Sequence, residues 1–467
     1  MKAPKVFVLG LDCAEPALLF GPWLDHLPHF KQLIQEGRHG QIRSCDPPIT
    51  VPAWSVMMSS HSPGTLGIYG FRNRADHSYD KLNIATSTSI KVKRLWDYLG
   101  EAGKKVVLIG VPQTYPPLPV NGCLVGDFLT PDIICDYTYP RELKLEIRKT
   151  VGDYLLDVRD FRTDNKDKIL ADIYEMTEKR FKLAFHFLES KPWDYFMMVE
   201  MGTDRIHHAF WSYMDPKHRA YEPGHRFEQA IFEYYKYLDG KLGELLQKLP
   251  PETHLFIVSD HGAKRMDGGI CINDWLIQEG YLHLKKKPDT VTPLAKAEID
   301  WSKTKVWGDG GYYARVFLNV RGRELQGIVE KADYEKLCKE LTEKIKAIPD
   351  EKGNSIPTEV HRPGDLYSTV NGIAPDLLVY FGGLHWRSIG TVGHDGIHTF
   401  ENDLGPDDAN HAEHGVLIYR AATDAKQPTQ CPSSFTGARL VDMAPTILRL
   451  FGLTPDKDME GKPLPLN

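Results

Sequence analysis

The first candidates for chemistry in this sequence are aspartate and histidine residues that directly follow short apolar segments. Carboxylate oxygens and imidazole nitrogens are ligands for Zn²⁺ and similar divalent ions. Three apolar segments end in this way, and the polar loop GPDDANHAEHG adds one more candidate; the residues are Asp12, Asp204, His208, Asp260, His261 and His411. Three such endings in one chain are much less expected by accident than any single one, so the set predicts a metal site.

Some of these residues have simpler explanations when they are taken singly. Asp12 at a strand end could cap a turn or the following helix. Asp204 and His208 are four residues apart, so they share one face of a helical turn and could chelate one ion. A solvated helix face, with His207 as the exposed neighbour, would explain the same pair, and the sequence leaves both interpretations open.

The pair Asp260 and His261, in the segment SDHG, is a stronger signal. Successive side chains of a strand point to opposite faces, so both can reach one ion only where the chain turns, and Gly262 permits that turn. His411 is the weakest member of the set because competing histidines lie nearby in the sequence, namely His394, His398 and His414.

A hydroxyl residue, Thr50, is the candidate nucleophile. It stands between Pro48 and Pro52, where we expect the chain to be extended and then to enter a helix. A hydroxyl at a helix N-terminus meets free N–H donors and the positive end of the helix dipole, which favour an alkoxide and an incoming phosphate. The simpler explanation is that Thr50 only caps the helix; the Asp/His set is what favours the catalytic role.

The elements that must position these residues follow from the apolar pattern. Short apolar runs without alternation, bounded by turn residues, are typical of buried parallel strands. We expect six of them, at residues 6–11, 106–109, 195–199, 255–258, 377–381 and 416–419. Helical patterns lie between them, and the clearest is the stripe Ile231, Tyr235, Leu238, Leu242 and Leu245. This alternation predicts a doubly wound α/β fold, a mostly parallel sheet flanked by helices, with ligands beyond the carboxyl ends of the strands.

A segment of different character, from about residue 285 to residue 385, interrupts this pattern. It is richer in charge, contains a predicted strand in YYARVFLNVRG, and has a helical patch around 334–348. We therefore expect a main domain of residues 1–284 and 386–467, with residues 285–385 as an inserted cap region. Four residues of the cap could either roof the site or belong to the cap's own core: Trp307, Tyr312, Tyr313 and Arg315. We favour a place in the cap's core.

The overall composition argues against several classes of function. The 467 residues are 42% hydrophobic and 26% charged with a formal net charge of -6, which fits a globular protein and disfavours a nucleic-acid polymer as partner. No segment reaches the roughly 18 apolar residues of a membrane span, and the run 6–11 is too short for a signal peptide. Seven cysteines without CxxC spacing fit reduced thiols, so we expect a cytoplasmic protein with no membrane partner.

Taken together, the motifs resemble the alkaline phosphatase superfamily, and most closely its type I phosphodiesterase / nucleotide pyrophosphatase branch. In the family's order, the matching segments are LGLDCAEP, ITVPAW followed by SPGTLGIYGF, GTDRIHH, SDHG, the His411 loop, and VDMAPTILRLFGL with MEGKPL. They run from residue 7 to residue 464 and leave only the cap region without a motif. His411 is preferred over His414 because its distance to GVLIYR matches the family's H-x-x-x-G spacing.

The resemblance implies a role for each candidate. The family's ligands fall into two sets, one for each of two divalent ions: Asp12, Thr50, Asp260 and His261, and then Asp204, His208 and His411. The ions would be Zn²⁺ or Mn²⁺, and nothing in these residues decides between them. Thr50 would attack phosphorus in a small-molecule phosphate ester and form a phospho-enzyme intermediate. The implied function is a metal-dependent phosphohydrolase of phosphodiesterase or nucleotide pyrophosphatase type.

The chain departs from the family pattern at Ala53. The phosphodiesterase branch usually has an asparagine there, which helps to hold a phosphate oxygen, so another group must supply that donor. The basic candidates are Lys264, Arg265 and Arg72, each of which could equally be an ordinary surface charge.

Other functions remain as alternatives. A phosphomonoesterase or a phosphoglycerate mutase-like enzyme would share the metals, although a mutase generally uses serine and a distinct large inserted domain. A sulfatase needs Cys or Ser followed by Pro-x-Arg, and neither TVPAW nor CDPPI carries the arginine. A metal-binding protein without turnover would need no nucleophile between the metals, so Thr50 counts against it.

Overall fold

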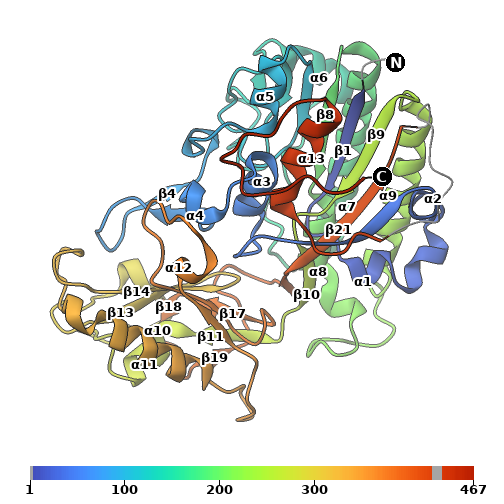
Figure 1. The fold of residues 1–467 in the computed structure, drawn as a ribbon. Helices are drawn as coiled ribbons and strands as arrows, with labels where there is room; N and C mark the ends of the chain where they lie inside the picture. The colour runs from blue at the N-terminus through green and yellow to red at the C-terminus, as the bar shows by residue number, and fades with distance from the viewer. Residues whose placement is uncertain (1–3, 423–433, 467) are drawn as a thin grey trace.

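The computed structural model describes residues 4–422 and 434–466, which form two lobes (Figure 1). The larger lobe is built on a nine-stranded sheet in the order β22-β2-β21-β9-β1-β8-β5-β6-β7. Its strands are β1 (Lys5–Leu11), β2 (Arg38–Arg43), β5 (Val106–Ile109), β6 (Gly122–Val125), β7 (Thr138–Tyr139), β8 (Tyr195–Glu200), β9 (Thr253–Val258), β21 (His414–Arg420) and β22 (Ala438–Arg439). The middle of this sheet is parallel, because β1 runs parallel to β8 and β9, and β5 runs parallel to β8 and β6.

Helices cover both faces of the large sheet, so the expected doubly wound α/β fold is confirmed (Figure 1). One layer contains α2 (Pro28–Glu36), α6 (Leu143–Val151), α7 (Lys166–Ser190), α8 (Gly202–Met214) and α9 (Ala230–Lys248). The other contains α3 (Thr50–Ser59), α5 (Leu95–Glu101) and α13 (Met443–Leu450). The predicted apolar stripe on 231–245 is the buried face of α9, and the sheet and both layers share one hydrophobic core.

Two of the six expected strands differ from the prediction. Segment 416–419 lies in β21, which runs antiparallel to β9 and β2. Segment 377–381 gives β16 (Leu377–Tyr380), which belongs to the smaller lobe and pairs antiparallel with its neighbours. Both expectations rested on uninterrupted burial. A strand covered on both faces is apolar whichever way it runs, so the pattern reveals neither its direction nor its sheet.

The smaller lobe has a core of its own under a four-stranded sheet in the order β13-β14-β16-β15. Besides β16, the sheet contains β13 (Val306–Asp309), β14 (Ala314–Leu318) and β15 (Glu359–His361), and the lobe also holds the helices α10 (Ile272–Gln278) and α11 (Tyr334–Lys346). The strand and the helix predicted in the cap, β14 and α11, are therefore confirmed. This core also includes Ile270 and Trp386, which lie outside 285–385. The domain limits 1–284, 285–385 and 386–467 therefore stay a proposal, with a cap core that reaches beyond both ends of the insertion.

The remaining helices and strands are short. They are α1 (Pro16–Leu19), α4 (Pro63–Leu66), α12 (Pro363–Leu366), β3 (Arg72–Arg74), β4 (Leu82–Ile84), β10 (Gly262–Arg265), β11 (Gly268–Cys271), β12 (Thr292–Pro293), β17 (Trp386–Ile389), β18 (Thr391–Val392), β19 (His398–Thr399) and β20 (Ala409–Ala412). Within the described ranges, no helix combines the length and the apolar character that crossing a membrane requires.

Candidate active site

The predicted metal ligands meet at the carboxyl edge of the central sheet. Strands β9, β1 and β8 are adjacent and parallel, so the residues that follow them emerge at one edge. Asp12 follows β1, Asp260 follows β9, and α8 with Asp204 begins just after β8. The antiparallel pairing of β10 with β20 places His411 opposite Ala263, close to the end of β9. Sheet topology thus gathers residues that lie up to about four hundred positions apart in the sequence.

Asp12, Asp260 and His261 form the first cluster, and all three side chains are fully buried. His261 Nε2 lies 3.3 Å from Asp260 Oδ2 and 3.7 Å from Asp12 Oδ1. The other oxygen of Asp12 accepts a hydrogen bond of 2.7 Å from Trp54 Nε1. Asp12 does not cap the following helix, because the carboxylate of Glu15 does so. Within the described residues the free oxygen of Asp12 has no hydrogen-bond partner, so Asp12 caps neither the turn nor the helix, and the capping explanation is wrong.

Thr50 is the first residue of α3, and its hydroxyl faces the first cluster. Thr50 Oγ1 lies 3.2 Å from His261 Nε2, and the side chain is only 3% exposed. The N-cap position is held by Ile49 without a side-chain hydrogen bond, so the capping explanation for Thr50 is also wrong. The first turn of a helix leaves N–H groups without intrahelical acceptors, and the helix dipole is positive there. The hydroxyl therefore stands where an anion is favoured.

Asp204, His208 and His411 form the second cluster. His208 Nε2 lies 3.2 Å from both Asp204 Oδ1 and His411 Nε2, and His411 Nε2 lies 3.9 Å from Asp204 Oδ1. His207 is fully buried and contacts the hydroxyl of Tyr235, so the solvated-face explanation for α8 is wrong. The rings of His261 and His411 stack with centroids 3.8 Å apart, which joins the two clusters.

The three histidines of the clusters are oriented in the same way. In each, Nδ1 donates a hydrogen bond to an oxygen: His208 to Asp407 at 2.7 Å, His261 to the Gly262 carbonyl at 3.0 Å, and His411 to the Pro48 carbonyl at 2.9 Å. With Nδ1 protonated, a neutral ring has its lone pair on Nε2, which faces the cluster. Burial lowers the pKa of His208, but Asp407 and Asp204 outweigh burial and raise it to about 9, so this ring must release its Nε2 proton when a metal ion binds. An acceptor that fixes the far ring nitrogen is the usual support of a metal-binding histidine.

The buried carboxylates of the first cluster suit a bound cation. Burial and the nearby Asp204 raise the pKa of Asp12 well above its usual range, and burial and Asp12 do the same to the pKa of Asp260. Two carboxylates about 4 Å apart repel by about 4 kcal/mol at an effective dielectric constant of about 20. In the described residues, the buried atoms Asp12 Oδ1 and Asp260 Oδ2 have no hydrogen-bond partner. Such oxygens together with imidazole nitrogens suit a divalent ion.

Arg205 and the histidines complete the electrostatics of the site. Burial raises the pKa of Asp204, but His208 and Arg205 outweigh burial and lower it well below its usual range. Burial lowers the pKa of His261 to about 4, and burial with the other two rings lowers that of His411. These two rings are therefore neutral near pH 7, which is the form that binds a metal ion.

Asp407 supports the second cluster, although it was not among the predicted site residues. It is fully buried on its side chain, and its carboxylate accepts from His208 Nδ1 at 2.7 Å and from Arg162 Nε at 3.1 Å. Burial raises the pKa of Asp407, but His208 and Arg162 lower it well below its usual value, so it is ionised. The signal in the sequence is its place in the same polar loop as His411.

We expect Asp407→Asn to weaken metal binding at the second cluster without unfolding the protein. An amide can present its NH₂ to His208 Nδ1, which would reverse the ring's tautomer and remove the lone pair from Nε2. Loss of such a support lowers metal affinity about 10–100-fold. Competition with a chromophoric chelator measures the change, and Asp215→Asn on the loop after α8 is a control. Unchanged affinity in Asp407→Asn would contradict this role.

Tyr312, from the cap, covers the second cluster. Its ring lies over His208 and His411 with centroid distances of 5.1 Å and 4.2 Å, and its hydroxyl accepts from Arg162 Nη2 at 2.7 Å. Tyr312 also packs against a small cluster of cap residues that includes Leu378 and Tyr380, so it both roofs the second cluster and takes part in the packing of the cap. The favoured interpretation, a place in the cap's own core, is confirmed for Trp307, which packs in the core of the smaller lobe.

Comparison with known proteins identifies the family. A sequence profile of the type I phosphodiesterase / nucleotide pyrophosphatase family matches residues 6–416. The chain belongs to this family. A search of curated proteins gives no match. Membership makes the chain a hydrolase of phosphate esters of the phosphodiester and pyrophosphate type, in a metal-dependent family whose members act on small phosphate esters.

Solved structures share the fold of this family member at low sequence identity. Human ectonucleotide pyrophosphatase/phosphodiesterase 5 is 15% identical with a TM-score of 0.53, over 99% of this chain and 96% of that chain. An inactive threonine-to-alanine variant of the murine protein, in complex with AMP, is 14% identical with a TM-score of 0.54, over 99% and 97%. Phosphonoacetate hydrolase from Sinorhizobium meliloti 1021, in complex with phosphonoformate, is 15% identical with a TM-score of 0.59, over 97% and 95%.

The competing histidines and the three basic candidates lie in different surroundings from the ligands. His398 bonds to the Pro349 carbonyl, His394 contacts Thr391, and His414 is exposed.

The basic candidates are engaged or exposed. Lys264 pairs with Glu413 at 2.7 Å, Arg265 pairs with Asp267, and Arg72 is exposed. A phosphate-binding role for Lys264, Arg265 or Arg72 stays a prediction, and the first two would have to leave an ion pair to perform it. Ala53 is fully buried and offers no side-chain donor.

Proposed function

We propose that this family member is a two-metal phosphodiesterase of nucleotide pyrophosphatase type, with Thr50 as the nucleophile. The observation that carries the proposal is the Thr50 hydroxyl at the N-terminus of α3, 3.2 Å from His261 Nε2. The ligands would be the two sets already predicted: Asp12, Thr50, Asp260 and His261 for one ion, and Asp204, His208 and His411 for the other. Bound there, divalent ions would lower the pKa of the attacking hydroxyl and neutralise charge on the phosphoryl oxygens.

The protein's own residues then have distinct tasks. Thr50 Oγ1 attacks phosphorus as its proton passes to solvent, and the new P–O bond forms a phosphothreonine that still carries the second ester group. The bond to the first ester oxygen breaks, and that oxygen leaves on the opposite side and takes up a proton from solvent as an alcohol or a phosphate. Water then breaks the phosphothreonine bond and releases the second product. The first-turn N–H groups of α3 supply donors near the phosphoryl oxygens, in place of the side chain that Ala53 lacks. An inactive threonine-to-alanine variant among the structural neighbours, which holds AMP, supports this role for a threonine.

The basic side chains around the clusters favour a diester over a monoester. Arg205 pairs with Asp157 and Asp204, while Arg162 pairs with Asp407. A monoester dianion carries one more negative charge than a diester, and these engaged guanidinium groups are not available to pair with it. An additional charge-assisted hydrogen bond would contribute about 1.5–3 kcal/mol. Without it, the monoester should be the poorer substrate.

We expect bis-p-nitrophenyl phosphate to be hydrolysed with a higher kcat/KM than p-nitrophenyl phosphate, by about tenfold or more, which corresponds to about 1.4 kcal/mol. Release of p-nitrophenol measures both rates with the same chromophore, so differences between leaving groups do not enter the comparison. As a control, Arg219→Ala on an exposed loop should leave the ratio of the two kcat/KM values unchanged. A preference for the monoester would contradict the diesterase proposal and favour the phosphomonoesterase alternative.

A further inference from the structure

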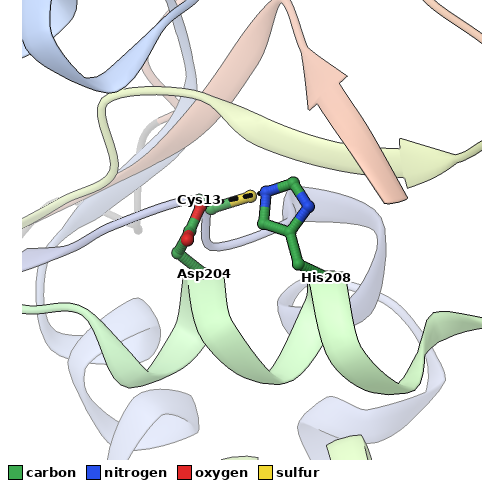
Figure 2. Close-up of side chains that lie close together, drawn as sticks. All are labelled: Cys13, Asp204 and His208. Carbon is green, nitrogen blue, oxygen red and sulfur yellow. Dashed lines mark ion pairs between the residues drawn. The ribbon is translucent and has the colours of Figure 1, made fainter. Parts of the chain in front are cut away.

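Cys13 lies in the turn after β1, directly after Asp12, and its side chain is fully buried. One ligand atom each of Cys13, Asp204 and His208 lies within 4.8 Å of the others. Figure 2 shows these three side chains turned toward one another, Cys13 from the turn and the other two from α8. The carboxylate and the imidazole are 3.2 Å apart. The sulfur therefore lies beside the second predicted metal position.

The thiol lies where the hydrophobic core meets the charged clusters. A buried cysteine usually behaves as a small hydrophobic residue. Here the thiol donates to the Gly262 carbonyl oxygen at 3.4 Å, and ligand atoms of Asp204 and His208 lie within 4.8 Å of the sulfur. The backbone N–H of Cys13 also donates to Asp260 Oδ1 at 3.2 Å, which ties the turn to the first cluster. The sulfur thus borders the hydrophobic core on one side and faces a carboxylate and an imidazole, two metal-binding groups, on the other.

We propose that Cys13 supplies a sulfur ligand to the ion held by Asp204 and His208, and that this ligand makes the position select Zn²⁺ over Mn²⁺. The inference rests on the proposed two-metal site and deepens it. The aspartate and histidine ligands alone suit either ion, whereas thiolate is a soft ligand that favours zinc. When the ion binds, the S–metal bond forms and the thiol proton passes to solvent. The first metal position, with oxygen and nitrogen ligands only, would lack this preference.

Cobalt(II) is the probe for this sulfur ligand, because it replaces zinc and absorbs visible light. The metal-free full-length chain is loaded with Co²⁺, and its spectrum is recorded. Ligand-field bands in the visible region report that cobalt is bound, and a near-ultraviolet charge-transfer band reports a thiolate on the ion. We expect both kinds of band in the unmodified protein. The charge-transfer band should be absent in Cys13→Gly while the ligand-field bands persist.

The variants are chosen so that folding does not confuse the result. Cys13 has a φ angle of 63°, which glycine adopts without strain, so Cys13→Gly should fold. Cys13→Ser is a second variant that keeps a side chain of similar size. Cys135→Ser is the matched control, because Cys135 is partly exposed, its sulfur contacts Asp132, and a serine hydroxyl can make the same contact. Its spectrum should equal that of the unmodified protein.

Competition with a chromophoric chelator gives a second readout. Zn²⁺ affinity should fall about tenfold or more in Cys13→Gly, with a much smaller change for Mn²⁺. Ligand-field bands without a charge-transfer band in the unmodified protein would overturn the role of Cys13 and leave the metal site intact. Failure of Co²⁺ to bind at all would overturn the proposed metal site together with this inference.

Discussion

Replacing Thr50 with alanine should lower kcat/KM for bis-p-nitrophenyl phosphate by about three orders of magnitude or more, the scale seen when an enzyme loses its nucleophile. The reason is that, within residues 4–422 and 434–466, Thr50 is the hydroxyl residue at the start of α3 that contacts the ring of His261. The loss corresponds to about 4 kcal/mol of transition-state stabilisation. Metal binding should persist, because the carboxylates and imidazoles of both clusters remain.

Two further variants make the Thr50 experiment specific. Thr50→Ser keeps the attacking oxygen and should retain far more activity than Thr50→Ala. Ser59→Ala removes another buried hydroxyl at the far end of the same helix, where it donates to the Ser55 carbonyl, and should leave turnover within a few-fold of normal. Metal content and thermal unfolding show whether each variant is folded. Near-normal hydrolysis by folded Thr50→Ala would remove Thr50 from the role of nucleophile.

Removal of metal should abolish hydrolysis and lower the thermal stability of the protein. Without ions, the buried carboxylates of Asp12 and Asp260 lie together, and their free oxygens lose their counter-charge. An ion that binds only the folded state, at a free concentration of about 100 times its Kd, raises the free energy of unfolding by about 2.7 kcal/mol. Tm should therefore fall after dialysis against a chelator and recover when Zn²⁺ or Mn²⁺ is added.

The control for metal removal is dialysis in the same buffer without chelator. Activity toward bis-p-nitrophenyl phosphate and Tm are measured on both samples, before and after metal is restored. An unchanged rate in protein shown by elemental analysis to be metal-free would contradict a metal-dependent mechanism. A fall in Tm without a fall in rate would leave the ions with a structural role only.

The parts of the site that the sequence predicts are those where local pattern and chemistry coincide. Buried strands are recognisable from apolar runs, and Asp12, Asp260 and His261 directly follow two of them. Parallel neighbours then bring those ends to one edge of the sheet. Asp204 and His208 were recognisable as a pair because four residues make about one helical turn. His411 depended on family spacing; in the structure it lies beside Asp204 and between the rings of His208 and His261, so its assignment to the second ion stays a prediction.

The parts that the sequence does not predict depend on contacts between distant segments. Asp407 supports His208 across 199 positions of the chain, and Tyr312 reaches the same ring from the cap. No local pattern encodes such a contact, because each residue alone resembles an ordinary polar or aromatic side chain. The direction of β21 was missed for a similar reason, since burial on both faces is the same for parallel and antiparallel strands.

Titration of the metal-free protein with Zn²⁺ tests the two-metal site most directly. Hydrolysis of bis-p-nitrophenyl phosphate is followed as metal is added, and elemental analysis counts the ions bound per chain. Two clusters joined through the stacked rings of His261 and His411 predict two bound ions, with full activity reached only when both are present. Full activity at one bound ion per chain, or activity that does not depend on added metal, would contradict the site described here.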